Sequence, residues 1–274
     1  MLAFSAYAVL PKLLRTDHQE IVEACHRQGI TRIGLAVSMT GKLFAVPEEI
    51  RRHKEALERD GLAVFGMYYG MGHPAMHEFY GDAGNPPPRT LFNDGLHIVE
   101  DWSAQGKLLP PGWRYAVNEF GRTVYCNACP DEACIEGNRR VLRETAALFR
   151  EIWYDDDYRL DGDQGAGAPA TSTAACYCDA CLASLSRRVG RTVRREDVLA
   201  DQALHDAWIE QKTDQLATLW EAMARTAREV NPRVELGLMI RWGGEERDGI
   251  ALEKLLPHFG PRPHLRVGEG HFGI

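Results

Sequence analysis

The sequence predicts an α/β fold of the (β/α)8 TIM-barrel type that is incomplete, with about six βα units. Strand-like apolar runs alternate with helical patterns along the chain, near residues 3, 31, 62, 151, 234 and 265. This alternation favours a parallel sheet with right-handed crossovers. The chain has 274 residues, 45% of them hydrophobic, which suffices for one large core. We therefore expect a single domain over residues 1–274. An open doubly wound sheet is the alternative, but no Gly-rich phosphate loop follows the first strand.

The first half of the chain predicts three strands and two helices. Residues 1–10 are apolar and lack the basic residues that start a signal peptide, so they predict a first strand. Asp17 can cap the following helix, and Gly29 ends it. Gly61 ends the second helix in the same way. The predicted strands are 1–10, 31–37 and 62–69, and the predicted helices are 17–28 and 47–59.

The second half resumes the alternation after a long irregular excursion, residues 70–130, whose first part is rich in Gly and Pro. We expect this excursion to be ordered over one face rather than to form a separate domain. A second irregular segment, residues 158–181, holds three cysteines at its end and opens a helix. Asn231 and Pro232 end the longest helical pattern. The predicted helices are 130–150, 176–189, 201–230 and 250–258, and the predicted strands are 151–154, 234–240 and 265–267.

Composition argues against several kinds of partner. The 32 basic and 39 acidic residues give a net charge of -7, without a basic cluster that could follow a phosphate backbone, so we expect no nucleic-acid partner. No apolar stretch is long enough to span a bilayer, so we expect no membrane partner. Seven cysteines, three of them in one short motif, suit metal binding in a reducing compartment better than a disulfide framework. The expected location is therefore cytoplasmic.

The cysteine motif predicts a zinc site. Cys176, Cys178 and Cys181 can turn toward one centre at little cost in loop closure, and a tetrahedral zinc site then needs one more soft ligand. Cys126 and Cys129 are the available donors. The alternative is a set of reduced buried thiols or an oxidised pair. Four thiolates leave no open position for water, so this zinc would be structural.

An acidic run, Asp155–Asp157, directly follows the strand predicted at 151–154. Three clustered carboxylates repel one another, so the pKa of at least one should lie above its usual range, which suits a proton donor at neutral pH. The alternatives are a solvated turn or a cation site built from these oxygens. The run is therefore a candidate for acid/base chemistry at a strand end.

Three segments carry a family resemblance. Residues 121–130 are Gly-Arg-Thr-Val-Tyr-Cys-Asn-Ala-Cys-Pro, residues 153–158 are Trp-Tyr-Asp-Asp-Asp-Tyr, and residues 176–181 are Cys-Tyr-Cys-Asp-Ala-Cys. In order and content they resemble glycoside hydrolase family 42, the zinc-containing β-galactosidases of a clan of retaining barrel enzymes. The first segment is similar to that family's strand ending in a zinc cysteine, the second stands in the place of its fourth-strand Asp-Asn-Glu-Tyr motif, and the third matches its Cys-Tyr-Cys-x-x-Cys motif.

The resemblance implies a structural zinc ion, a carbohydrate substrate and a set of site residues. The zinc ligands would be Cys126, Cys176, Cys178 and Cys181. The catalytic residues would be Asp157, as the acid/base, and Asp156, in place of the family's asparagine. The family's nucleophile follows its seventh strand, so we expect it beyond the C-terminus of this sequence. The resemblance is also compatible with a homo-oligomer, since trimers are common in that family.

Further residues are expected at the rim of the sugar site, because side chains at the carboxyl ends of barrel strands point to that rim. Aromatic rings and polar groups there commonly contact sugars. The candidates are Tyr68, Tyr69, His73, Asp155, Arg241, Trp242, Glu269 and His271. The pair Asn118-Glu119 also spells the family's acid/base motif, but it precedes the cysteines, and we expect a surface turn or a hairpin edge there.

The predicted function is the retaining, β-galactosidase-like hydrolysis of glycosidic bonds in an oligo- or polysaccharide. Retention needs an acid/base and a nucleophilic carboxylate about 5 to 5.5 Å apart. Position 157 carries aspartate where the family has glutamate, so the alternative is a non-catalytic carbohydrate-binding or scaffold barrel with a structural zinc. A third hypothesis is a metal-dependent hydrolase that uses Asp155–Asp157 as oxygen ligands.

Overall fold

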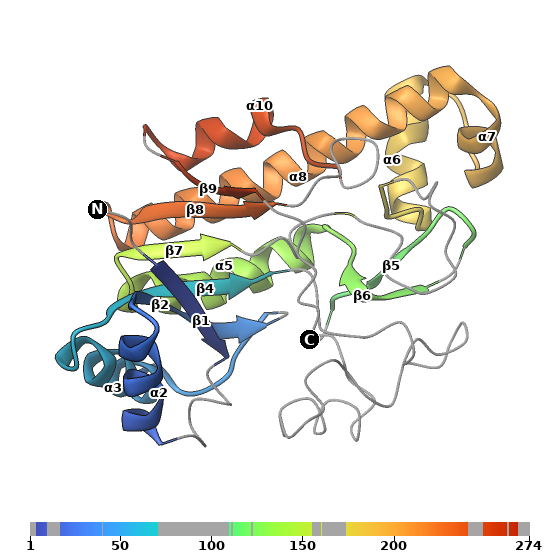
Figure 1. Cartoon of the computed structure of the whole chain (residues 1–274). Coiled ribbons are helices and arrows are strands. Elements are labelled where there is room, and N and C mark those ends of the chain that lie inside the picture. The colour runs from blue at the N-terminus through green and yellow to red at the C-terminus, as the bar shows by residue number, and fades with distance from the viewer. Residues whose placement is uncertain are drawn as a thin grey trace.

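The structure, a computed structural model, describes residues 4–9, 17–39, 41–70, 110, 112–121, 123–154, 160, 174–240, 249–261 and 263–267. Within these residues six parallel strands form one sheet in the order β1-β2-β4-β7-β8-β9 (Figure 1). Their bounds are Phe4–Val9 for β1, Ile30–Met39 for β2, Ala63–Tyr69 for β4, Glu151–Tyr154 for β7, Glu235–Ile240 for β8 and His264–Val267 for β9.

The predicted α/β class and parallel sheet are confirmed. Among these six strands, those that follow one another along the chain are neighbours in the sheet. A doubly wound sheet would reverse direction at a switch point near its middle, which this order does not do. The order is that of an incomplete (β/α)8 barrel, and β7 is its fourth strand.

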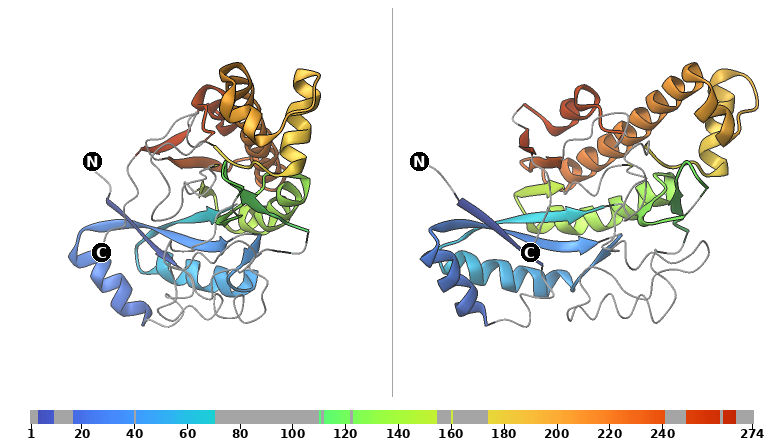
Figure 2. Two further views of the ribbon diagram at one scale, coloured as in Figure 1. Left: turned by 90° about the vertical axis from the view of Figure 1, so that its right-hand side faces the viewer. Right: turned by 45° about the vertical axis from the view of Figure 1, so that its right-hand side comes forward.

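Helices connect the strands and lie against one face of the sheet (Figures 1 and 2). Three of them begin at aspartate caps: Asp17 accepts a hydrogen bond from the N–H of Gln19, Asp131 accepts one from the N–H of Cys134, and Asp201 accepts from the N–H groups of Ala203 and Leu204. No helix in the described part of the chain combines the length and apolar character that crossing a bilayer requires. The bounds are His18–Arg27 for α2, Pro47–Arg59 for α3, Glu132–Leu148 for α5, Gln202–Val230 for α8, Leu252–Leu255 for α10 and Leu256–Phe259 for the 3-10 helix η2.

The main hydrophobic core lies between the sheet and these helices. Alternate residues of the strands face it, including Leu35, Ile152 and Leu236, which are fully buried. The longest helix, α8, contributes Trp220, whose ring packs edge-on against Tyr154 with ring centres 4.7 Å apart. These contacts hold the second half of α8 along the helix-covered face of the sheet.

The opposite face of the sheet carries a smaller cluster. Phe65 and Met67 of β4 are buried there beside Trp153 of β7, whose indole N–H donates to Glu151 at 2.6 Å. The ring of Trp153 lies over the backbone of Gly237, where a Cβ atom would meet it at 2.5 Å. Only a glycine lets the indole approach the neighbouring strand so closely.

Gly237→Ala is therefore expected to lower the free energy of unfolding by about 1 to 3 kcal/mol, because the added methyl group displaces the Trp153 ring. Urea unfolding followed by tryptophan fluorescence measures this loss. In a Trp153→Phe background the same change should cost less, since a smaller ring leaves room. Equal losses in the two backgrounds would contradict the packing described for Trp153.

Four short elements lie outside the strand and helix ranges predicted from the sequence, although a hairpin edge is one expectation for Asn118-Glu119. A two-residue strand, β3 (Lys42–Leu43), pairs antiparallel with β2. Within the predicted excursion, β5 (Tyr115–Val117) and β6 (Thr123–Ala128) form an antiparallel hairpin. A short helix, α7 (Arg195–Ala200), precedes α8. The single domain and the rest of the two irregular segments stay predictions, because much of both segments lies outside the described residues.

Candidate metal centre

A second, smaller hydrophobic core surrounds three buried cysteines and packs against a fourth. It is formed by the β5–β6 hairpin, α6 (Asp179–Val189) with the loop before it, α7 and the first turns of α8. These elements lie on the side toward which the strands β4 and β7 point (Figures 1 and 2). The buried residues of this core are Ala116, Cys129, Ala175, Cys176, Tyr177, Cys181, Leu182, Leu185, Val193, Val198, Leu204 and Trp208, and Cys178 packs against them partly exposed.

The four sulfur atoms have the spacing of a tetrahedral metal site. The Sγ of Cys129 lies 3.8 Å from that of Cys178 and 3.9 Å from that of Cys181. Together with Cys176, all four lie within 4.8 Å of one another, and all are free thiols. Zinc–sulfur distances of about 2.3 Å place the sulfurs of a tetrahedral site about 3.8 Å apart. These cysteines can therefore hold a metal ion.

Backbone hydrogen bonds bring the two cysteine segments together. The N–H of Val117 in β5 donates to the Sγ of Cys176 at 3.2 Å, and the carbonyl of Val117 accepts from the N–H of Tyr177 at 2.6 Å. The N–H of Cys129 donates to the carbonyl of Arg114 at 2.8 Å. The hairpin thus presents Cys129 to the cysteine loop, although about fifty residues separate them in the sequence.

The sulfurs are close enough to share protons. Hydrogen bonding, first of all with Cys129, lowers the pKa of Cys178 to about 6 and also lowers the pKa of Cys181. Hydrogen bonding with Cys176 raises the pKa of Cys129 above its ordinary value. Thiolates are the metal-binding form, so a bound ion would displace protons from this cluster. Protons compete with the metal, and binding should weaken as the pH falls.

The identity of the fourth thiol differs from the preferred prediction. Cys129, the rival of Cys126 in the sequence, is the thiol found with Cys176, Cys178 and Cys181. Cys126 lies in β6, and its side chain is outside those that the structure describes. We assign the fourth position to Cys129, and a ligand role for Cys126 stays an untested prediction.

The acidic run follows the fourth strand, β7, as the sequence predicts. Asp155, Asp156 and Asp157 lie outside the described residues, so their catalytic and sugar-binding roles stay predictions. The structure resumes at Leu160, which is fully buried and whose carbonyl accepts a hydrogen bond from the N–H of Ala175 at 2.5 Å. Ala175 precedes Cys176, so Leu160, three residues after Asp157 in the sequence, is bonded directly to the cysteine loop.

Of the predicted rim residues, only Tyr68 has a described side chain. It is fully buried on the helix-facing side of β4, and its hydroxyl donates to the carbonyl of Asn138 at 3.0 Å. This geometry gives Tyr68 a packing role, and sugar contact by it remains untested. The backbone of Tyr69 ends β4, but its side chain is not described. The remaining candidates, which lie outside the described residues, are His73, Arg241, Trp242, Glu269 and His271.

The pair Asn118-Glu119 lies in the turn of the β5–β6 hairpin, as expected of a hairpin edge. The N–H of Gly121 donates to the carbonyl of Asn118 at 3.0 Å and closes the turn. The turn is more enclosed than expected, because Glu119 is 5% exposed. A buried carboxylate in a turn next to the small core is a feature that hydrophobic patterning could not reveal.

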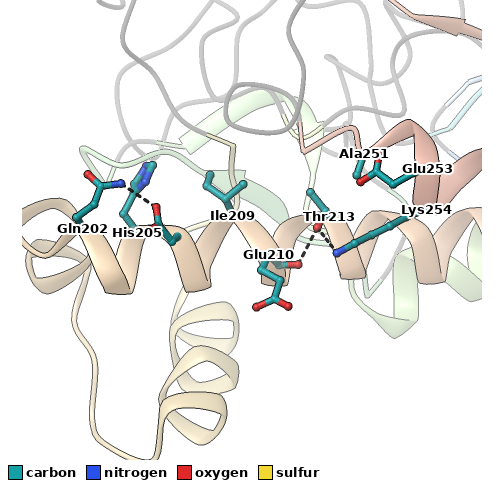
Figure 3. A pocket seen from close by; sticks show the side chains of 9 residues that line it. Gln202, His205, Ile209, Glu210, Thr213, Ala251, Glu253 and Lys254 are labelled. Carbon is teal, nitrogen blue, oxygen red and sulfur yellow. Dashed lines mark hydrogen bonds between the residues drawn. The ribbon is translucent and has the colours of Figure 1, made fainter.

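A pocket of about 380 Å³ lies between α8 and the start of α10 (Figure 3). The ammonium group of Lys254, which lines the pocket, already has partners: it donates to Thr213 at 2.7 Å and to Asp214 at 2.6 Å. None of the predicted site residues lines it, so we assign it no role. The lining residues are Gln202, His205, Asp206, Ile209, Glu210, Thr213, Ala251, Glu253 and Lys254.

No protein-family model matches the chain, and neither does any curated protein sequence. Solved structures with a similar fold include glycoside hydrolases. The catalytic domain of a β-amylase from Paenibacillus polymyxa is 11% identical with a TM-score of 0.62, over 97% of this chain and 77% of that one. A β-galactosidase from Rahnella sp. R3 is 12% identical with a TM-score of 0.62, over 98% of this chain and 39% of that one.

The glycoside hydrolase domain of PgaB from Bordetella bronchiseptica is 12% identical with a TM-score of 0.54, over 97% of this chain and 74% of that one. At these identities the similarity shows the fold, which is that of TIM-barrel glycosidases. The chain spans well under half the length of the β-galactosidase.

Proposed function

We propose that this protein hydrolyses glycosidic bonds in an oligo- or polysaccharide with retention of anomeric configuration, in the manner of a β-galactosidase. Asp157 acts as the acid/base: its carboxylic acid protonates the leaving oxygen, and its carboxylate then removes a proton from the attacking water. Retention also needs a second carboxylate about 5 to 5.5 Å away, which attacks the anomeric carbon in the first step and to which no residue of this sequence is assigned. Asp156, the second catalytic candidate, and Asp155, a candidate for sugar contact, directly precede Asp157 in the sequence.

The observation that carries this proposal is the place of the acidic run in the barrel. It follows β7, the fourth strand of the parallel sheet, without an intervening residue. Active sites of (β/α)8 barrels form at the carboxyl ends of their strands. The similarity in fold to β-galactosidases and a β-amylase supports a carbohydrate substrate.

The metal of the four-cysteine cluster is zinc in this proposal, and its role is structural. Four soft thiolate donors at tetrahedral spacing suit zinc and leave no position for a water molecule. When bound, the ion fastens the hairpin to the cysteine loop. That loop is bonded to Leu160, so the zinc centre would also help to hold Leu160, three residues after Asp157 in the sequence.

Nitrophenyl glycosides test the reaction. We expect the protein to release nitrophenol from a β-galactoside, with the β anomer of the free sugar formed first in proton NMR spectra. An α anomer formed first would contradict retention. Activity that EDTA abolishes and magnesium restores, with the zinc still bound, would instead support the metal-dependent hydrolase.

A non-catalytic carbohydrate-binding barrel is the second candidate. The observation that favours it is the aspartate at position 157, whose side chain is one methylene shorter than the glutamate of the resembling family. Calorimetric binding of galacto-oligosaccharides together with no release of nitrophenol would support this candidate over hydrolysis.

A further inference from the structure

Helix α8 presents three polar side chains, Gln211, Lys212 and Gln215, to the cysteine loop. The Nζ of Lys212 donates to the carbonyl oxygen of Cys176 at 3.0 Å, and the Nε2 of Gln211 donates to that of Cys181 at 3.0 Å. The Nε2 of Gln215 lies 3.9 Å from the Sγ of Cys181. One face of α8 therefore contacts two of the four candidate metal ligands.

Lys212 is an unusual residue for this position because its side chain is 0% exposed. Its ammonium group lies 3.8 Å from the centre of the Trp208 ring and donates to the Oε1 of Gln215 at 3.0 Å. Across the described ranges of the chain, no carboxylate forms an ion pair with it. A buried ammonium without a counter-charge costs several kcal/mol, so an anionic partner is to be expected nearby.

The four-cysteine cluster supplies that partner when it holds a metal. Four thiolates around a divalent ion carry a net negative charge of two, and three of these cysteines are at most 3% exposed. Such a buried anion needs a positive group beside it as much as the ammonium needs a negative one. Among the described residues, four neutral thiols would offer Lys212 no negative group beside it.

We propose that Lys212 is the charge-compensating residue of the metal centre: its buried ammonium group offsets the negative charge of the metal-bound cluster, while Gln211 and Gln215 orient Cys181. The inference rests on the zinc centre proposed above. Lys212 does not bind the metal. It acts through the ligands, by charge and by its hydrogen bond to the carbonyl of Cys176.

Lys212→Gln tests the charge, because glutamine keeps a hydrogen-bond donor at the end of the side chain. Its zinc affinity, measured by competition with a chromophoric chelator, should be about 10- to 100-fold weaker than that of the wild type. Lys54→Met is the matched control, since it removes a lysine charge from α3, where Lys54 pairs with Glu58 on the surface of the helix. Its zinc affinity should equal that of the wild type.

A second measurement separates charge compensation from simple packing. Urea unfolding of the metal-free and zinc-bound proteins should show that Lys212→Gln destabilises the zinc-bound form and leaves the metal-free form at least as stable as the wild type, because a buried charge has gone. An equal loss in both forms would overturn the proposal in favour of a packing role.

The two proposals fail differently. A wild-type protein that binds no zinc would overturn the zinc centre and this inference with it. A wild-type protein that binds zinc, with Lys212→Gln binding it equally tightly, would overturn the role of Lys212 alone and leave the zinc centre standing.

Discussion

Cys129→Ser is expected to abolish zinc binding, whereas Cys126→Ser keeps it. The Sγ of Cys129 lies 3.8 and 3.9 Å from two of the other sulfurs, at the spacing of a tetrahedral site, and a serine hydroxyl is a poor replacement for a thiolate. Atomic absorption should find about one zinc per chain in the wild type. The opposite result, with zinc lost from Cys126→Ser and kept in Cys129→Ser, would return the fourth position to Cys126.

Loss of the zinc should open the small core and spare the main one. The small core joins a short hairpin, a loop and helices, it is smaller than the main core, and three of its buried residues are cysteines of the metal cluster, so it depends more on the ion than the main core does. In hydrogen-exchange mass spectrometry of Cys129→Ser, we expect protection to fall in β5, β6 and α6 and to persist in β2 and β4. Cys25→Ser is the control, because Cys25 is buried on α2 against the main core, and this variant should retain both its zinc and its protection.

Asp157→Asn is expected to lower turnover of a phenyl β-galactoside by about 10² to 10⁴-fold, because an amide can neither protonate the leaving oxygen nor activate water. A dinitrophenyl leaving group needs little protonation, so its departure in the first step should be affected least. Azide should restore turnover with that substrate and yield a β-glycosyl azide, since an anionic nucleophile needs no base. These three readouts separate loss of the acid/base from general damage to the site.

Asp206→Asn makes the same chemical change at an exposed position of α8 and should leave turnover unchanged. If Asp157→Asn also cleaved the phenyl substrate undiminished, the assignment of Asp157 would be wrong. Asp156→Asn then becomes the next variant, because Asp156 is the neighbouring candidate at the same strand end.

The strands and helices of the main sheet could be predicted because each is specified by its own residues. Pro47 begins α3, and Gly61 follows its end at a backbone φ of 90°, which favours glycine. The β5–β6 hairpin could not be predicted in the same way. Its strands are short, they pair only with each other among the described strands, and β5 is further held by the bonds of Val117 to the distant cysteine loop.

Part of the candidate site could also be predicted. The three cysteines of the motif are neighbours in sequence, so their convergence needs no knowledge of the fold. Lys212 was missed, although one signal pointed to it: it lies four residues from both Trp208 and Leu216, in phase with the buried stripe of α8. A lysine in this stripe indicates either that this turn of α8 is exposed to solvent or that the lysine charge is buried. Only the residues packed around the lysine distinguish the two.

By itself, the sequence determined the order of the α/β units, the three-cysteine motif and the position of the acidic run after the fourth strand. These depend on residues a few positions apart, whose spacing the covalent chain sets. Only the tertiary structure decided that Cys129 completes the thiol cluster, that Lys212 lies buried beside it and that Tyr68 faces the helices. Those outcomes depend on contacts between distant segments, and the packing of the whole chain sets them.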